Sequence, residues 1–533
     1  MIDTKALRQK ILDLAIRGKL VPQDPDDEPA SVLLERIRQQ KQQMVKEGKL
    51  KPKDIKNDSV IFVGEDNLHY EKFSNGSVKC IEDEVPFGLP DGWAWVRLGN
   101  LSAAIQYGLS NSAEPQGTHR LLRITDIQDG KVDWNAVPFT TVNDPEAYLL
   151  KTGDIVFART GATVGKSFLI TETPYPSVYA SYLIRIRLLG SLSPEYIYQF
   201  FDSACYWSQI TDKSVGVGQP NCNGTSLKEL FIPLPPISEQ LRIVPTAQVL
   251  LAYVAKIDAE KKSLLSIIMA TKSKILDLAI RGQLIPQDPN DEPASVLLER
   301  IRAEKEELIK QGKIKRDKKE SVIFRGEDNS YYEKIGTEVY CIDEEIPFDI
   351  PDTWEWMRLE SCCIKEIRRG KSPKYIDESG TLVFAQKCNT RYSGIDVGLA
   401  LFLDENTLGR YPDDEYMQDG DVVINSTGTG TLGRVGIYHA TDNYLGLPIV
   451  PDSHVTIIRA ARSIQSVYLY GFMKANQSEL EKEGEGSTNQ KELKPLTLKE
   501  MLIPIPPYSE QERIVATITA AFSTISAIEN SLN

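Results

Sequence analysis

Lys10-Ile11-Leu12-Asp13-Leu14-Ala15-Ile16-Arg17-Gly18 recurs without a change as residues 274–282, in a chain of 533 residues. The stretch DEPASVLLERIR at residues 27–38 recurs in the same way at 291–302. Further along, LKELFIPLPPISEQ at 227–240 returns as LKEMLIPIPPYSEQ at 498–511. A repeat this long indicates a duplicated domain and not a solenoid. Two near-identical frames enclose two unlike interiors, which favours one scaffold that presents two different recognition surfaces.

The composition is that of an ordinary globular protein, with 41% hydrophobic and 26% charged residues. No apolar run approaches the ~20 residues that span a bilayer, and the N-terminus shows no secretory signal pattern. The seven cysteines form no C-x-x-C pair, and Cys362 and Cys363 are adjacent. We therefore expect free thiols in a reducing cytoplasm. The net charge of −13 argues against coating nucleic acid through bulk charge.

Helical patterns dominate the frames. Residues 5–17 carry an amphipathic helix that Gly18 stops, and a second helix ends at Gly48. A long helix is predicted from 238 to 282, reaching roughly 65 Å, with a kink or a later start at Pro245. The matching C-terminal helix is expected to begin at Ser509, with Glu512 in a capping box. The simplest arrangement is a pseudo-twofold molecule with two globular domains held apart by antiparallel helices.

The interiors are predicted to be α+β. Short hairpins are expected at 59–67 and 321–329, each followed by two tryptophans spaced i, i+2 that would share one side of a strand and anchor the next domain. Residues 183–188 alternate like a half-buried strand, and Ser193-Pro194 starts a helix. The second interior offers residues 468–473 at the matching place. The expected buried stripe of the first helix is Ile197, Phe200, Phe201 and Ala204.

Two segments resemble catalytic motifs but depart from the required patterns. GATVGKS at 161–167 is one residue short of a phosphate loop, and the matching segment at 428–435 has neither the Lys nor the Ser. A glycine-rich turn that lets backbone and a basic side chain approach a phosphodiester remains. The Pro-Pro pairs at 235–236 and 506–507 follow Leu234 and Ile505, which cannot hydrogen-bond an amine, so a rigid exit into the helix is expected. Neither a metal-ligand spacing nor a nucleophile–base pattern occurs in the sequence.

Three motifs occur in order, twice. Pro-x-x-Trp-x-Trp-x-x-Leu starts at Pro90 and at Pro351, and Gly-Asp followed by a short strand and Thr-Gly spans 153–161 and 420–428. The Leu-Lys-x-x-x-Ile-Pro-x-Pro-Pro-x-Ser-Glu-Gln exits close each copy. Together they resemble the specificity subunit of type I restriction–modification systems over essentially the whole chain. The acidic balance and the long segments at 49–85 and 311–346 depart from the family pattern.

This resemblance implies an α+β fold with two α/β target recognition domains separated by long antiparallel helices. It implies a non-catalytic subunit that binds double-stranded DNA at a bipartite site and docks two methyltransferase subunits and the restriction/translocase subunits. S-adenosylmethionine and ATP with Mg²⁺ would be bound by those partners, and none by this chain. The expected divisions are conserved helices at 1–50, a linker with a hairpin at 51–98, a first recognition domain at 99–236, spacer helices at 237–312, a second linker at 313–360, a second recognition domain at 361–507 and a C-terminal helix at 508–533.

Polar and basic residues on glycine- and proline-rich loops are the candidates for DNA contact, because Arg, Lys, Asn and Gln recognise base edges or bind phosphates. The alternative for any one of these residues is that its side chain is solvated on the surface and does not contact DNA. In the first interior they are Tyr107, Ser110, Asn111, Arg120, Arg159, Thr160, Lys166, Gln219, Asn221 and Asn223. In the second they are Arg368, Arg369, Lys371, Lys374, Gln386, Lys387, Asn389, Arg391, Asn425, Arg434, Asn489 and Gln490.

Other classes of protein remain as alternatives. One is an enzyme such as a fused methyltransferase or nuclease, against which the missing motifs count. A second is a pure protein scaffold, which sequence-dependent DNA binding would exclude. A third is a non-catalytic DNA-binding scaffold of another phage-defence methyltransferase system. The base sequence recognised cannot be deduced, because DNA shape contributes along with side-chain contacts.

Overall fold

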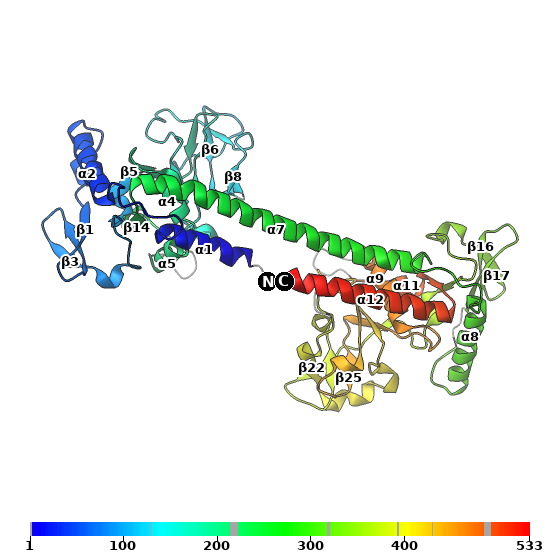
Figure 1. Cartoon of the computed structure of the whole chain (residues 1–533). Coiled ribbons are helices and arrows are strands. Elements are labelled where there is room, and N and C mark those ends of the chain that lie inside the picture. The colour runs from blue at the N-terminus through cyan, green and yellow to red at the C-terminus, as the bar shows by residue number, and fades with distance from the viewer. Residues whose placement is uncertain are drawn as a thin grey trace. The chain divides into compact units, whose positions relative to one another are not determined.

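The computed structural model describes residues 3–128, 130–213, 222–316, 320–391, 394–428, 430–483 and 492–532. The chain divides into two compact units, Met1–Lys262 and Ser263–Asn533. Both units follow the same order of elements: frame helices, a small three-stranded sheet, a larger domain of mixed sheets and helices that corresponds to the predicted recognition domain, and a long helix. Figure 1 shows the course of the chain through each unit. The duplicated α+β organisation predicted from the sequence is therefore confirmed.

The frame helices form where the repeated sequence predicts them. They are α1 (Thr4–Ile16), α2 (Ala30–Lys46) and α8 (Ala294–Lys310). The side chain of Asp3 caps α1 by accepting the Ala6 N–H. Gly18 and Gly48 follow the first two helices with φ of 65° and 70°, the left-handed conformation that ends a helix.

The long helix α7 (Ile237–Ile280) begins earlier than Pro245 suggested, and the proline lies inside it. A proline cannot donate to the carbonyl four residues before it, which here belongs to Leu241. That residue is 65% exposed, so solvent can satisfy the carbonyl. The C-terminal helix α12 (Tyr508–Leu532) begins one residue before the predicted start. Ser509 therefore lies inside the first turn and is not the N-cap of the predicted capping box.

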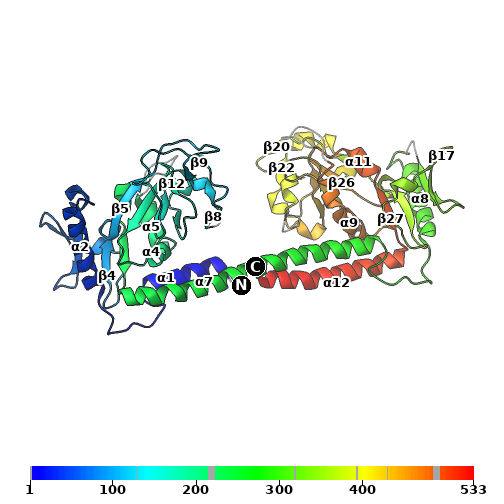
Figure 2. The same ribbon diagram turned by 90° about the horizontal axis from the view of Figure 1, so that it is seen from above.

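Antiparallel pairs of helices form in each unit, as Figure 2 shows. In the first unit, Ile11 of α1 packs with Ala247 and Val254 of α7, and Thr4 donates to Asp258 at 3.0 Å. In the second unit, α12 packs against the C-terminal part of α7. Its contacts are Ile514 and Ile518 with Leu276 and Ala279, and an ion pair between Lys272 and Glu529.

A small antiparallel sheet precedes each recognition domain. The predicted hairpins are present, and each gains a third strand. The sheets are β1 (Ser59–Val63), β2 (His69–Phe73) and β3 (Val78–Cys80), and β15 (Ser321–Arg325), β16 (Tyr331–Ile335) and β17 (Glu338–Cys341).

The paired tryptophans do not share one side of a strand. Strand β4 (Ala94–Arg97) begins after Trp93, so that residue lies in the preceding turn. Trp93 packs into the core of the recognition domain, whereas Trp95 packs under the small sheet. Trp354 and Trp356 divide in the same way around β18 (Glu355–Arg358). In each pair, one tryptophan therefore packs under the small sheet and the other packs into a second hydrophobic cluster, so the pair joins two parts of its unit.

The first recognition domain is built on a four-stranded sheet in the order β11-β10-β13-β5 and a three-stranded sheet in the order β12-β6-β9. A two-stranded sheet of β14 and β4 closes the domain beside the start of α7. The strands are β5 (Ser102–Tyr107), β6 (His119–Leu122), β9 (Phe139–Thr140), β10 (Ile155–Ala158), β11 (Ser167–Leu169), β12 (Ser177–Tyr179), β13 (Leu183–Leu188) and β14 (Phe231–Leu234). The helices are α3 (Leu98–Leu101), α4 (Pro194–Phe200), α5 (Ala204–Lys213) and α6 (Gly224–Lys228).

The second recognition domain repeats this plan, with sheets in the orders β19-β26-β23-β24 and β20-β22-β21-β25 and a closing pair of β18 and β27. The strands are β19 (Arg368–Arg369), β20 (Tyr375–Ile376), β21 (Leu382–Phe384), β22 (Leu401–Leu403), β23 (Val422–Asn425), β24 (Val435–Ile437), β25 (Ile449–Pro451), β26 (Val455–Ile458) and β27 (Leu502–Ile505). The helices are α9 (Ser466–Ala475), α10 (Gln477–Leu480) and α11 (Pro495–Lys499).

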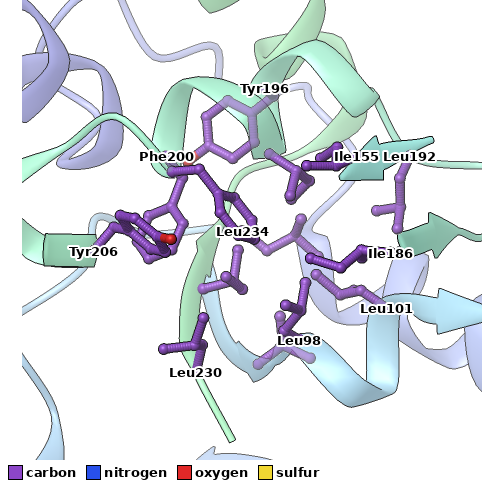
Figure 3. Packing of buried hydrophobic residues seen from close by; sticks show 14 of the residues in the cluster. Leu98, Leu101, Ile155, Ile186, Leu192, Tyr196, Phe200, Tyr206, Leu230 and Leu234 are labelled. Carbon is purple, nitrogen blue, oxygen red and sulfur yellow. The ribbon is translucent and has the colours of Figure 1, made fainter. Parts of the chain in front are cut away.

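The core of the first domain lies between the sheet and helices α4 and α5, where Tyr196, Phe200 and Tyr206 pack beside aliphatic side chains (Figure 3). Ser193 caps α4 as predicted. The predicted buried stripe is wrong at its end, because α4 ends at Phe200, and Ala204 is exposed and begins the next helix, α5.

Strand β13 is more buried than its alternating sequence predicted. Arg185 is only 2% exposed, since its guanidinium donates to the Leu149 carbonyl at 3.0 Å and to the Gln106 side chain at 2.6 Å. Burial lowers the pKa of this arginine. A buried arginine is tolerated where it has such acceptors. Within the described residues, no helix is both long and apolar enough to cross a membrane.

Candidate nucleic-acid interface

The glycine-rich turn of the first domain joins the antiparallel strands β10 and β11. A phosphate loop leads from a strand into a helix, so this turn is not one. Gly161 and Gly165 have φ of 75° and 91°, and a Cβ on Gly165 would lie 2.5 Å from the Trp207 ring. The turn thereby holds the backbone close to α5 and leaves Lys166 exposed to solvent.

The matching turn of the second domain joins β23 and β24 and is one residue longer. Gly433 has φ of 74°, and a Cβ there would lie 2.6 Å from the Glu481 backbone nitrogen. Its N–H donates to the Asn425 carbonyl at 2.8 Å, as the Gly165 N–H donates to the Ala158 carbonyl at 3.0 Å. The two turns therefore share one backbone design, and their side chains differ.

An aromatic and basic cluster forms at one end of the first four-stranded sheet. The Arg159 guanidinium carbon lies 4.8 Å from the centre of the Tyr107 ring, and the Arg159 backbone N–H donates to the Tyr182 carbonyl. The Tyr107 hydroxyl accepts the Gly224 N–H at 2.9 Å, next to Asn223, which caps α6. Stacking a guanidinium on an aromatic ring orients it without neutralising its charge. This end of the sheet can thus present a fixed cation to a phosphate or a base.

Of the remaining candidates of the first domain, some lie next to this cluster and others lie elsewhere in the domain. Thr160 follows Arg159 at the edge of the turn, and Ser110 and Asn111 are exposed on the loop after β5. Arg120 lies against the Phe139 and Tyr175 rings, at 3.9 and 5.1 Å, and donates to the Val137 carbonyl. Its guanidinium therefore supports the second sheet. Gln219 and Asn221 lie outside the described residues.

In the second domain, the amide candidates form an internal network. Asn389 and Asn425 are buried at 1% and 0% exposure, and the Asn389 amide donates to the Asn425 side chain at 3.2 Å. Asn425 in turn donates to the Gln386 carbonyl at 3.1 Å. Arg434 donates to the Asn389 and Gly430 carbonyls at 2.8 and 3.1 Å. These side chains hold the turn in place and have few groups left for DNA.

Most basic candidates of the second domain are paired with acids. Glu415 is 2% exposed, and its carboxylate lies 2.6 Å from Arg368, 3.3 Å from Lys371 and 3.6 Å from Lys365. Burial opposes ionisation of Glu415, but these three cations together hold its pKa below 4.5. Lys365, which the sequence did not single out, is itself 6% exposed, and burial lowers its pKa.

Four more candidates of this domain lie among the described residues. Lys374 pairs with Asp404 at 2.7 Å, and Arg369 pairs with Glu492. Lys387 and Arg391 are exposed. Asn489 and Gln490 lie outside the described residues.

Two groups near the turns escaped the sequence prediction. Tyr182 is 64% exposed beside Arg159, and His454 shares a hydrogen bond of 2.7 Å with Thr427 beside the second turn. Tyr182 lies between β12 and β13, and His454 lies between β25 and β26, where no glycine or proline pattern drew attention to them. An alignment of the two interiors on their Gly-Asp motifs could have located these segments.

The repeated motifs have structural roles. Asp154 and Asp421, each 2% exposed or less, pair with Arg187 and Arg459, and each arginine–carboxylate distance is as short as 2.6 to 2.7 Å. Each aspartate also accepts a backbone N–H three residues earlier, which tightens the turn before the central strand. A bidentate pair of this kind fixes geometry as well as charge.

The Ser-Glu-Gln exits bind the long helices to the domains. Glu239 accepts the Trp93 indole N–H at 2.8 Å and the Gln23 amide at 3.4 Å, and burial raises its pKa. Glu510 makes the same bonds to Trp354 and Gln287, at 2.9 and 2.7 Å. These contacts explain why the Trp, the Glu and the frame repeat together.

Two features with a bearing on the sequence analysis lie in the part of the chain that the structure describes. No group of three or more His, Cys, Asp or Glu side chains there could hold a metal ion. Both Pro-Pro pairs lie between a closing strand and a long helix, which is the rigid exit predicted for them.

Comparison with known proteins settles the family. The model of the type I restriction modification DNA specificity domain matches twice, at residues 90–267 and 351–533. Each match runs from the Trp motif through a recognition domain into its long helix. This chain belongs to that family.

Individual relatives agree with the assignment. The chain is similar to the type I restriction enzyme EcoEI specificity subunit of Escherichia coli, with 26% identity over 99% of this chain and 90% of the relative. It is 29% identical to the EcoAI specificity subunit of the same species, over 67% of this chain and 62% of the relative. A solved structure from a study of type I R-M complex assembly and conformational transition is 19% identical, covers 84% of this chain and 94% of its own, and has a TM-score of 0.51, which supports the shared fold.

Proposed function

We infer that this chain is the DNA-recognition subunit of a type I restriction–modification complex. It is not itself an enzyme, and it binds a bipartite DNA site with one recognition domain for each half. It also docks methyltransferase and restriction subunits. The observation that carries this function is the paired architecture, in which one sheet and turn design occurs twice with different side chains at its open end. Different side chains on one scaffold are what two different half-sites require.

For the first half-site, we propose contact by the cluster of Tyr107, Arg159 and Asn223, together with Lys166. Their support is position, because they gather at one end of a rigid sheet, and chemistry, because arginine and lysine bind phosphate or guanine. For the second half-site, the exposed Lys387 and Arg391 are the better candidates. The buried Asn389 and Asn425 would act by shaping the turn, since they are already bonded to each other.

The cofactors of the complex belong to its other subunits in this proposal. S-adenosylmethionine would be bound by the methyltransferase subunits, and ATP with Mg²⁺ by the restriction subunit. We place the complex in the cytoplasm, because its substrate is the DNA of the cell and of invading phage.

The test is methylation mapping. The chain is co-expressed with its methyltransferase subunit in a host that lacks other adenine methylation, and the methylated sites are sequenced. One motif of two half-sites separated by an unread gap supports the function, and omission of this chain should abolish the methylation. Methylation of unrelated or undivided sites would contradict the proposal.

A further inference from the structure

The two small sheets expose the same side chains. On the face that points away from the core, Val60 and Phe62 of β1 are 42% and 40% exposed, and Val78 of β3 is 52% exposed. The other sheet exposes Phe324 at 40% and Val339 at 52%. From the strand registers, the residues of this outer face are Val60, Phe62, Tyr70, Lys72, Val78 and Cys80 in one sheet, and Val322, Phe324, Tyr332, Lys334, Val339 and Cys341 in the other.

All six positions of the outer face are identical between the two sheets, and the opposite face is not. On the opposite face, four of the seven positions that are strand residues in both sheets differ. They are Val63 and Arg325, His69 and Tyr331, Phe73 and Ile335, and Lys79 and Tyr340. A recent duplication would leave both faces alike. Exposed positions of the opposite face have diverged, as at Val63 and Arg325 or Lys79 and Tyr340, whereas the exposed positions of the outer face have not. This contrast indicates that the outer face has a binding role.

The aromatic part of the face is held in the same geometry twice. Phe62 and Tyr70 stack with ring centres 5.9 Å apart, as do Phe324 and Tyr332. The Tyr70 hydroxyl donates to Asp66 at 2.8 Å, and this bond lowers the pKa of that carboxyl. Tyr332 makes the same bond to Asp328 at 2.8 Å. Rigid, exposed aromatic side chains lose little entropy on binding and are typical anchors of protein interfaces.

The charges favour a protein and not DNA as the occupant. Residues 59–84 carry six acidic and two basic side chains, and residues 321–345 carry seven and two. Such a balance repels phosphates. Lys72 and Lys334 lie between the two valines of their face, and neither has an ion-pair partner among the described residues. A partner must therefore bring apolar side chains and an oxygen acceptor for this lysine.

We propose that the outer faces of the two small sheets are equivalent docking surfaces, each for one methyltransferase subunit. The inference rests on the proposed function, which supplies a partner present in two copies for each chain. Two identical surfaces, one in each half of the chain, fit two copies of one protein. The restriction subunit or a second copy of this chain are the other occupants that the test distinguishes.

The exposed thiols provide a direct test. Cys80 and Cys341 are exposed within the two faces, and the other five cysteines are buried or half-buried. The full chain, alone and with a saturating amount of methyltransferase subunit, is treated briefly with a fluorescent maleimide, and labelled sites are identified by mass spectrometry. We expect both cysteines to react in the free chain and both to be protected in the complex. Equal reaction rates in the free chain and in the complex would overturn the proposal.

Variants add a stoichiometric readout. Phe62→Glu or Phe324→Glu should leave one methyltransferase copy bound in native mass spectra, and the double variant none, each face binding about 30-fold more weakly. Val63→Arg is the matched control, because Val63 is next to Phe62 but lies on the opposite face, where the second sheet has Arg325 at the equivalent position. This variant should bind two copies. Three results would each refute the assignment. They are two methyltransferase copies bound to the double variant, cysteine protection by the restriction subunit alone, and cysteine protection that depends on the concentration of this chain alone. These assays contain no DNA, so a failure of the DNA-recognition function would appear separately, in the methylation map.

Discussion

Removal of the Arg159 side chain is the sharpest perturbation of the proposed DNA contact. Its guanidinium lies 4.8 Å from the Tyr107 ring, and its Nε is buried without a hydrogen-bond partner among the described residues. The stacking contact fixes the direction of the charge, so Arg159→Ala removes one oriented cation. Arg159→Lys keeps a charge but loses the planar group that stacks and binds two acceptors.

The expected magnitude depends on what the guanidinium contacts. If it binds one phosphate, the slope of log affinity against log salt falls by about 0.9, so the loss of affinity between 50 and 200 mM salt becomes about 3.5-fold smaller. Arg159→Lys would then restore most of the slope. If it contacts a guanine instead, the cost is about 1–3 kcal/mol, roughly 5- to 150-fold in affinity, and specificity relaxes at one position of the first half-site.

The assay is fluorescence anisotropy of a labelled duplex carrying the mapped site, titrated with the complex of this chain and its methyltransferase at several salt concentrations. Lys53→Ala removes an exposed charge outside the recognition domains and is the control for bulk charge. Lys166→Ala, at the exposed end of the same turn, should lower the slope by about one phosphate as well. Unchanged affinity and slope in both Arg159→Ala and Lys166→Ala would refute the placement of DNA at this end of the sheet.

Three further predictions concern the scaffold. Glu415→Gln leaves the buried Lys365 with only the more distant and exposed Asp414 carboxylate, at 3.9 Å, as an acidic partner, and should cost the second unit about 3–5 kcal/mol in chemical denaturation. Because the pKa of Glu415 is lowered from 4.5, the wild type holds this stability above about pH 4.5 and loses it as the pH falls, and Gln should abolish that acid dependence. Trp93→Phe removes the donor to the buried Glu239 and should cost about 1–3 kcal/mol of stability. Trp354→Phe should cost a similar amount through Glu510. Resistance to limited proteolysis reports both effects, and a loss of resistance in one variant alone would contradict equivalent roles. Four residues inserted after Ala259 lengthen α7 by ~6 Å with a rotation of only ~40° and should widen the unread gap of the methylated site by one or two base pairs, whereas an unchanged gap with full activity would show that α7 does not set it.

The fold was largely predictable because the sequence repeats. The frame helices, the small hairpins and the capped helix at Ser193 follow from period, proline and glycine signals that act locally. The errors arose where tertiary contacts override local pattern. Burial of Arg185 on β13 depends on the distant Leu149 and Gln106, and the division of Trp93 from Trp95 depends on which body lies on each side of β4.

The candidate site was predictable only in part. Residue type and glycine-rich context located Arg159 and Lys166, which lie on one turn. The same criteria selected Asn389, Asn425 and Arg368, whose side chains are occupied by internal partners that no sequence pattern reveals. A polar side chain on a loop serves the protein or its ligand according to whether an acceptor lies nearby, and that is a property of the fold.

Exchange of one recognition domain tests the central claim most directly. Residues 361–507 are replaced by the corresponding interior of a relative whose methylated sequence is known, with both frames kept, and the methylome of the host is sequenced. Because each domain carries its own core and its own turn, one half-site should change to that of the relative while the other half-site and the gap stay as they were. A change in both half-sites, or in neither, would contradict recognition by two independent domains.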